Sequence, residues 1–245
     1  MSAPRFFCPL PLQAHTTLPL PADVAHHAVR VRRLRDATPV ILFNGHGGEY
    51  PAVLQVEGKQ VWCHLGEHVE REAELPGAIV LVQGLAGGDK MDWIIEKAVE
   101  LGVTGVVPIA AQRSVLQLSG ERLEKRLAHW QRIVESASEQ CGRNRLLQVH
   151  PPRTLQAFLQ ESGAHALRTT YLCHPEAPRA LRDALGGPAE TLSFMVGPEG
   201  GWSDDEYALA QRYSVATVRF GDRILRTETA GLAMASAASA LLGWI

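Results

Sequence analysis

Residues 192–201 read LSFMVGPEGG, an apolar run that passes directly into a turn rich in proline and glycine. Residues 220–230 read FGDRILRTETA, which again joins a strand-like stretch to a helix-like one. Glycine lets the backbone approach a ligand closely, so the first turn predicts a binding loop. Because loops at neighbouring strand ends of an open α/β sheet enclose a crevice, the two stretches together predict a small-molecule site.

Upstream of these loops, strand-like and helix-like patterns alternate from residue 78 onward. The apolar run at 78–83 is continuous, as in a strand that is covered on both faces of its sheet. Ser203 is a candidate N-cap for one of the helices. Further strands are predicted at 103–109, 170–172, 191–196 and 215–220, and helices at 91–101, 119–141, 155–161 and 204–212. This alternation predicts an α/β fold with a parallel sheet.

The first 75 residues have a different pattern. Strands are predicted at 40–43, 49–56 and 61–65, with a short helix at 22–34 between earlier strands. Such short strands fit a small β-barrel. Because the hydrophobic period changes near a Pro-Gly pair at 76–77, we expect two domains, residues 1–72 and 73–245.

Several blocks of sequence, in order along nearly the whole chain, resemble the RsmE family, the 16S ribosomal RNA (uracil-N3)-methyltransferases of the SPOUT class. The blocks are RFF at 5–7, VILFNGHGGEY at 40–50, KMDWIIEKAVELGV at 90–103, QRS at 112–114, EQCGR at 139–143, GPEGG at 197–201 and ILRTETA at 224–230. The resemblance implies a SPOUT-type parallel sheet tied in a trefoil knot, preceded by a small PUA-like β-barrel domain that binds RNA.

The resemblance also implies S-adenosyl-L-methionine as cofactor, held by three loops of the second domain. Glycines in two of these loops supply close backbone, while Ile224 and Leu225 supply an apolar wall. A third loop follows Tyr171. The predicted cofactor-binding residues are Leu172, Cys173, His174, Gly197, Glu199, Gly200, Gly201, Phe220, Gly221, Ile224, Leu225, Arg226 and Thr229.

The chemistry of the implied reaction points to two catalytic candidates, Arg226 and Glu228. Uracil N3 carries a proton at neutral pH, so methyl transfer needs that proton removed or the developing anion stabilised. Arg226 follows an apolar pair, and we expect its guanidinium to enter a partly dry pocket. Glu228 could orient Arg226, cap the following helix or take the proton. Glu199 could instead hold its own loop.

The net charge of −2 does not by itself favour nucleic acid, but arginines gather in residues 1–48 and 112–153. A basic face is enough for phosphate contacts, although solvated helix surfaces would give the same pattern. The predicted RNA-binding residues are Arg5, Arg30, Arg33, Arg113 and Arg143. Each could equally be a structural arginine in a salt bridge. The expected partner is 16S rRNA within the assembled small subunit.

Other features of the chain set its expected surroundings. The four cysteines form no C-x-x-C pair and no secretory signal is evident, so a cytoplasmic protein is expected. No metal site is expected, since there is neither an H-E-x-x-H motif nor a Cys/His quartet. No stretch is long and apolar enough to span a membrane convincingly.

The last helix, residues 230–242, carries small and apolar side chains around most of its circumference, which predicts a homodimer.

Three other functions fit parts of the sequence. A dinucleotide-dependent oxidoreductase is suggested by Gly84, Gly87 and Gly88 after a strand, but the spacing differs from G-x-G-x-x-G. A non-enzymatic RNA-binding module would leave the C-terminal loops unexplained. A methyltransferase acting on ribose 2′-OH differs only in the atom that receives the methyl group.

Overall fold

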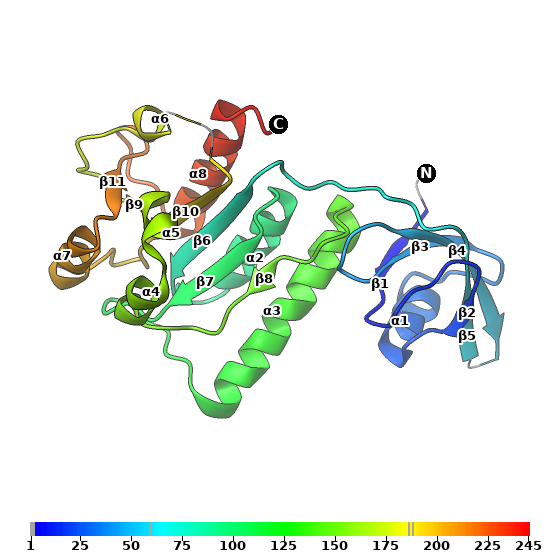
Figure 1. The fold of residues 1–245 in the computed structure, drawn as a ribbon. Helices are drawn as coiled ribbons and strands as arrows, with labels where there is room; N and C mark the ends of the chain where they lie inside the picture. The colour runs from blue at the N-terminus through cyan, green and yellow to red at the C-terminus, as the bar shows by residue number, and fades with distance from the viewer. Residues whose placement is uncertain (1–2, 59, 186, 188) are drawn as a thin grey trace. The chain divides into compact units, whose positions relative to one another are not determined.

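The computed structural model describes residues 3–58, 60–185, 187 and 189–245, and the chain divides into two compact units (Figure 1). Unit 1 comprises Met1–Glu74 and Glu135–Leu146, and unit 2 comprises Leu75–Val134 and Leu147–Ile245. The break after Glu74 lies two residues beyond the boundary predicted from the sequence. Residues 135–146, which the sequence analysis placed in the second domain, belong to unit 1.

Unit 1 is built on a mixed five-stranded sheet in the order β1-β3-β4-β5-β2. Its strands are β1 (Arg5–Phe7), β2 (Thr17–Pro19), β3 (Pro39–Phe43), β4 (Tyr50–Glu57) and β5 (Gln60–Leu65). In β5 alternate side chains are buried, as expected for a sheet with one face on a core. The three longer strands match the prediction, whereas β1 and β2 are too short to show a period.

The helical segment of unit 1 is shorter than predicted. Instead of one helix over 22–34, the chain forms α1 (Ala22–His26) and a π-helical turn, η1 (His27–Val31). Arg33 then adopts a left-handed conformation, with φ of 56°, and the Leu34 N–H donates to the Ala28 carbonyl. This arrangement ends the helix, because a left-handed residue reverses the chain after the last turn. Val24 and Ala28 of this segment are buried together with side chains of the sheet in one hydrophobic core.

Unit 2 holds a six-stranded sheet in the order β11-β9-β10-β6-β7-β8, in which every pairing is parallel. Its strands are β6 (Ala78–Gly84), β7 (Gly105–Ile109), β8 (Gln148–Val149), β9 (Thr170–Cys173), β10 (Thr191–Val196) and β11 (Ala216–Val218). The predicted α/β fold with a parallel sheet is confirmed. The two-residue β8 was not predicted, and β11 is shorter than the apolar run that suggested it.

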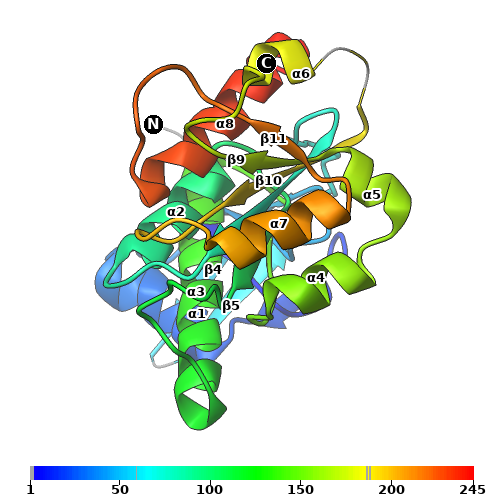
Figure 2. The ribbon, with the colours of Figure 1, turned by 90° about the vertical axis from the view of Figure 1, so that its left-hand side faces the viewer.

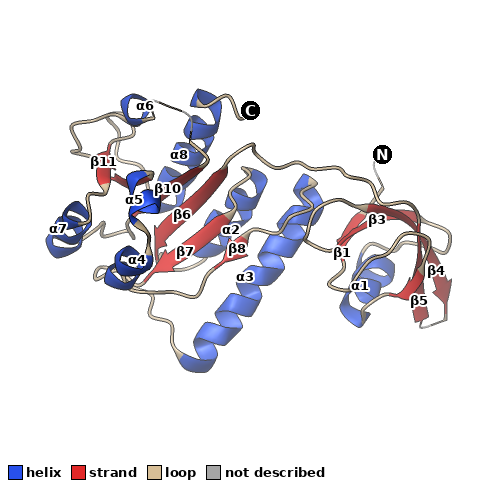
Figure 3. Cartoon of the chain, in the orientation of Figure 1, coloured by secondary structure: helices blue, strands red, loops and turns tan. Residues whose placement is uncertain are grey.

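Helices cover both faces of this sheet (Figures 2 and 3). They are α2 (Lys90–Glu100), α3 (Gly120–Cys141), α4 (Leu155–Glu161), α5 (Ala164–Arg168), α6 (Leu181–Ala184), α7 (Asp204–Arg212) and α8 (Thr227–Leu241). Helices α4 and α7 share one core with the sheet, while α8 packs on β6, β10 and α2. Ser203 caps α7 as predicted, through a reciprocal pair of hydrogen bonds with Glu206. Within the described residues, no helix has the length and apolarity to cross a membrane.

Candidate functional site

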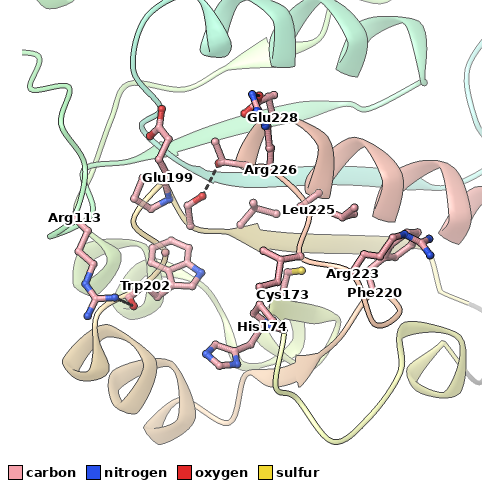
Figure 4. A pocket seen from close by; sticks show the side chains of 18 of the residues that line it. Arg113, Cys173, His174, Glu199, Trp202, Phe220, Arg223, Leu225, Arg226 and Glu228 are labelled. Carbon is pink, nitrogen blue, oxygen red and sulfur yellow. Dashed lines mark hydrogen bonds and ion pairs between the residues drawn. The ribbon is translucent and has the colours of Figure 1, made fainter.

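A cavity of about 520 Å³ opens in unit 2, where β9, β10 and β11 end (Figure 4). Parallel strands present their carboxyl ends at the same edge of a sheet, so the loops that follow them meet there. Three of these loops line the cavity, at residues 173–175, 196–202 and 220–228, together with Lys90, Arg113 and Ala230. Its volume lies within the range of roughly 300–1,000 Å³ that is usual for small-molecule sites.

Most of the residues that the sequence predicted to bind a cofactor line this cavity. They are Cys173, His174, Gly197, Glu199, Gly201, Phe220, Gly221, Ile224, Leu225 and Arg226. Three others do not. Leu172 is fully buried in the sheet core, and Thr229 faces solvent from the first turn of α8. The side of Gly200 that a Cβ would occupy faces Arg113. The sequence placed the loops together, but it did not reveal which side of each loop faces the ligand.

The glycine-rich turn after β10 closes tightly upon itself. A Cβ at position 197 would lie 2.9 Å from backbone atoms of Gly201 and Trp202, closer than a side chain tolerates. Gly201 has φ of 69°, a left-handed conformation that glycine adopts without strain, and open space lies where its Cβ would be. The turn therefore exposes backbone to the cavity.

Arg113 braces this turn from outside. Its Nη1 donates to the carbonyls of Gly200 and Trp202, both at 3.1 Å. A Cβ at position 200 would meet the Arg113 Cβ at 3.1 Å, so the space beside Gly200 belongs to Arg113 rather than to a ligand. The Arg113 side chain is still 49% exposed and lines the cavity. Its Nη2 lies 3.9 Å from Oδ1 of the exposed Asp204, too far for a hydrogen bond, so further guanidinium hydrogens can bind a ligand.

Glu199 joins the same turn to the loop before α2. Its carboxylate accepts hydrogen bonds from Lys90 Nζ at 2.7 Å and from the Gly87 N–H at 3.0 Å. Burial opposes ionisation of this carboxyl, but the hydrogen bonds from Lys90 and Gly87 outweigh it and lower the pKa of Glu199. Glu199 thus holds the loop before α2, whereas the sequence suggested only that it could hold its own loop.

A buried relay of hydrogen bonds ties the turn to α8. Thr227 Oγ1 donates to the Gly197 carbonyl at 2.6 Å and accepts from Gln83 Nε2 at 2.9 Å. The second amide hydrogen of Gln83 goes to the Gly84 carbonyl. Because a carbonyl oxygen can only accept, the Thr227 hydroxyl must donate to Gly197 and can therefore only accept from Gln83. Gln83, which is 1% exposed, was not singled out by the sequence because no motif marks it.

The two catalytic candidates differ in their surroundings. The Arg226 side chain is 84% exposed, so the expected partly dry environment is not met in this chain. The Glu228 side chain is only 19% exposed, and its Oε2 is buried with no hydrogen-bond partner among the described residues. Arg226 Nη1 lies 4.0 Å from Glu228 Oε1. Figure 4 shows both side chains on the cavity side of α8.

The inner wall of the cavity is largely neutral. Burial raises the pKa of the Cys173 thiol to about 11, so this side chain is uncharged at neutral pH. Trp202, which is 7% exposed, also lines the cavity. Its Nε1 is buried without a hydrogen-bond partner in the described structure. Trp202 was not predicted to line the site, although it directly follows the predicted binding loop GPEGG.

Two of the predicted RNA-binding arginines are engaged within unit 1. Arg143 is 3% exposed and pairs with Glu74, to which its Nε donates at 3.0 Å. Arg5, whose side chain is 11% exposed, pairs with Glu49 and donates to Asn144. These contacts hold residues 135–146 onto the rest of the unit. Contact of Arg5 or Arg143 with phosphates stays a prediction, and it would compete with these internal pairs.

Arg30 and Arg33, by contrast, lie at the surface of unit 1. Both are exposed, and neither forms an ion pair with any residue that the structure describes. They remain predicted RNA contacts. For metal ions, the described residues contain no group of three or more His, Cys, Asp or Glu that could act as ligands.

Family models match both parts of the chain. Residues 73–239 match an RNA methyltransferase domain, and residues 20–65 match an RNA methyltransferase PUA domain. These ranges fall on either side of the change in hydrophobic period near residue 76 and cover most of the chain.

Relatives of the whole chain carry one name. The chain is 31% identical over 232 residues to "Ribosomal RNA small subunit methyltransferase E" of Bacillus subtilis, covering 91% of this chain and 90% of the relative. It is 32% identical over 229 residues to the protein of that name from Synechocystis sp., covering 92% and 74%.

Solved structures agree with these relatives. The protein of the same name from Neisseria gonorrhoeae, bound to S-adenosyl methionine, is 37% identical with a TM-score of 0.92 and 98% coverage of both chains. A putative methyltransferase from Legionella pneumophila, in complex with the bound cofactor SAM, is 30% identical with a TM-score of 0.91 and the same coverage. The predicted cofactor of the family is thereby confirmed. The chain therefore belongs to the ribosomal RNA small subunit methyltransferase E family of RNA methyltransferases.

Proposed function

We propose that this protein transfers a methyl group from S-adenosyl-L-methionine to N3 of a uridine in 16S ribosomal RNA of the small subunit. The observation that carries the proposal is the cavity at the ends of β9, β10 and β11, in a chain whose relatives are named for small-subunit rRNA methylation. The target atom follows from the resemblance to uracil-N3 methyltransferases.

The residues that line the cavity fit this cofactor. Backbone of the 197–201 turn offers hydrogen-bonding groups for an adenine edge, and Leu225 and Val196 offer apolar surface. The neutral Cys173 thiol adds no charge beside a sulfonium. Lys90, the cavity's lysine, is neutralised by Glu199. When bound, S-adenosylmethionine supplies an electrophilic methyl group.

We assign the catalytic roles to Arg226 and Glu228. An exposed guanidinium can reach an incoming base and stabilise the negative charge that develops on uracil O2 or O4. The Glu228 Oε2 has no donor in the described chain and so is available to accept the N3 proton or an N–H from the base. The 4.0 Å approach of the two side chains would keep Arg226 oriented.

RNA binding is proposed for exposed arginines in both units. In unit 2, Arg113 lines the cavity and keeps free donors, so it is placed to grip a phosphate next to the target base. In unit 1, Arg30 and Arg33 are proposed to contact other phosphates of the RNA. Because the relatives are named for the small subunit, we propose the assembled subunit as substrate. A ribosomal substrate also implies a cytoplasmic location.

We further propose a homodimer. Helix α2 packs against α8, and Trp93 of α2 is 45% exposed although it is large and apolar. Leu241 near the end of α8 is 54% exposed. α8 also shows small side chains, such as Ala233 and Ala237, that are only partly covered. A second copy would bury this surface.

The trefoil knot implied by the resemblance is also kept as a proposal. It is supported by the position of β10 between β9 and β6, and by the Thr227 hydroxyl that fastens the 220–227 loop to the turn after β10.

The reaction is tested by nucleoside analysis of 16S rRNA from cells with and without this protein. We expect 3-methyluridine to disappear from the digest without the protein, and to return when purified protein and S-adenosylmethionine are added to small subunits. Naked 16S rRNA, run in parallel, tests the choice of substrate. A methyl group on the ribose, or an unchanged digest, would contradict the proposal.

A further inference from the structure

Unit 1 contains a second hollow, of about 540 Å³, which the proposed chemistry does not use. It lies where the end of β2, the α1–η1 segment and the start of β5 meet. Its apolar lining includes Leu20, Val29 and Val61, and its remaining wall includes Trp62, His26 and Arg30. Trp62 is partly exposed, whereas its neighbours Val61 and Cys63 are buried in the core. A hollow with an apolar lining and a tryptophan among its wall residues suits a flat aromatic ligand.

The surface beside the hollow is positively charged. Arg30 lines it, and the next few residues add Arg32, Arg33 and Arg35, all exposed. No side-chain ion pair to these four is found among the residues described. Of the nearby carboxylates, Asp36 accepts a hydrogen bond from the Val56 N–H, and Asp23 lies on the first turn of α1. Glu139 accepts from the Phe7 N–H, lies 3.9 Å from His27 and offsets part of the charge of Arg32. The remaining positive charge, on Arg30, Arg33 and Arg35, favours an anionic ligand.

The backbone of this segment is also unusual. Arg33 occupies the left-handed position after a helix end, where glycine is strongly preferred. A side chain in that conformation is less favourable than glycine, so arginine here lowers stability. The preceding turn is π-helical, a form that is rare overall and that often occurs at functional sites. A charged side chain thus stands beside the hollow at a position where glycine would be more stable.

We infer that the hollow binds one nucleobase of a single-stranded segment of the RNA substrate, with Trp62 against the base and Arg30 and Arg33 on the adjoining phosphates. The inference rests on the proposed function, since it names where unit 1 holds the RNA. Single-stranded RNA combines an unstacked aromatic ring with phosphate charge, which are the two features that this surface complements. A base inside a duplex is stacked on both sides and cannot enter.

The test is fluorescence anisotropy with a labelled single-stranded RNA of about 12 nucleotides, a length within the usual range of single-strand sites. Trp62→Leu keeps the hollow apolar but removes the aromatic face. We expect it to raise the Kd for this RNA by about 5- to 150-fold, the range for loss of one stacked base. Trp62→Phe keeps an aromatic face and should stay within a few-fold of the parent.

The variant Arg33→Gly distinguishes a loss of RNA contacts from a loss of folding stability. Because glycine suits the left-handed conformation, this variant should raise Tm by up to about 4 °C. It should nevertheless weaken RNA binding and lower the slope of log K against log salt by about 0.7, the effect of one lost phosphate contact. The matched control is Ser214→Gly in unit 2, where Ser214 has φ of 60° after α7. It should raise Tm as well and leave RNA binding unchanged.

The outcomes distinguish this inference from the proposed function. If Trp62→Leu and Arg33→Gly bind the RNA as the parent does, the hollow is not an RNA site, while methylation of small subunits by the parent still stands. Equal competition by a duplex of the same sequence, or by a polyglutamate peptide, would also overturn it. If the parent forms no 3-methyluridine, the proposed function fails, whatever the variants bind.

Discussion

At the scale of single residues, the environment of a side chain decides its role more than its motif does. Arg226 and Glu228 belong to one motif, yet 84% of one side chain is exposed and 19% of the other. Arg143 also lies in a family-like block, yet its guanidinium is buried against Glu74. An exposed arginine can reach a substrate, whereas a buried pair contributes to folding and is costly to break.

For Arg226 we expect the alanine variant to lose methyl transfer while keeping the cofactor. A contact to charge that develops in the transition state is typically worth about 10²–10³-fold in rate, so kcat should fall by that factor. The Kd for S-adenosylmethionine, measured by calorimetry, should stay within a few-fold. The control is Arg223→Ala, which removes another arginine that lines the cavity. Turnover close to that of the parent would show that Arg226 is not catalytic.

At the scale of elements, side chains from distant segments hold the loops of the cavity. Glu199 connects the turn after β10 to the loop before α2, and Thr227 connects it to α8. Arg113 braces the same turn from a third segment. These contacts mean that the shape of the cavity depends on residues that need not touch a ligand.

Thr227 gives a test of that dependence. Thr227→Val keeps the shape but leaves the Gly197 carbonyl and a Gln83 amide hydrogen without partners, a cost of about 1–3 kcal/mol for each buried group. We expect the Kd for S-adenosylmethionine to rise about 10-fold or more as the turn relaxes. Thr227→Ser restores the hydroxyl and should restore binding. Equal affinity of the Val variant, measured by calorimetry, would mean that the relay does not shape the site.

Glu199 predicts a dependence on pH. Its pKa in the folded protein is lowered below the ordinary 4.5, so its stabilising contribution is present above that value and is lost as pH falls through the folded pKa. The difference in Tm between the parent and Glu199→Gln should therefore be constant near neutral pH and shrink as the pH falls below the ordinary carboxyl value of 4.5. Glu96→Gln, at an exposed pair with Lys97, serves as control. A difference that does not change with pH would contradict this account.

At the scale of the whole molecule, unit 1 is discontinuous in sequence. Residues 135–146 belong to it, and Asn144 among them is fully buried and donates to Glu49. A fragment that begins near Gly77 would keep these residues without their partners, leaving polar groups unsatisfied that are now buried. RNA binding by unit 1 is therefore better tested by point substitutions than by deleting the first 76 residues.

The proposed homodimer gives the last prediction. Trp93→Glu places a charge at the exposed tryptophan of α2, and burying an unpaired charge opposes association. Sedimentation equilibrium should then give a mass near the single-chain 26.7 kDa, against about twice that mass for the parent. The control is Val115→Glu, since Val115 is 84% exposed elsewhere in unit 2, and this variant should stay dimeric. A parent of single-chain mass would refute the dimer.

The sequence by itself determined the alternation of strands and helices in unit 2 and the two loops that meet at the sheet edge. It could do so because periodicity and turn residues are local, and parallel strands bring their carboxyl ends together. Only the tertiary structure decided that Gly200 faces Arg113, that Gln83 holds Thr227, and that Arg5 and Arg143 pair with carboxylates whereas Arg30 and Arg33 are exposed. Each of these depends on contacts between segments far apart in the chain, because packing sets burial and hydrogen-bond partners.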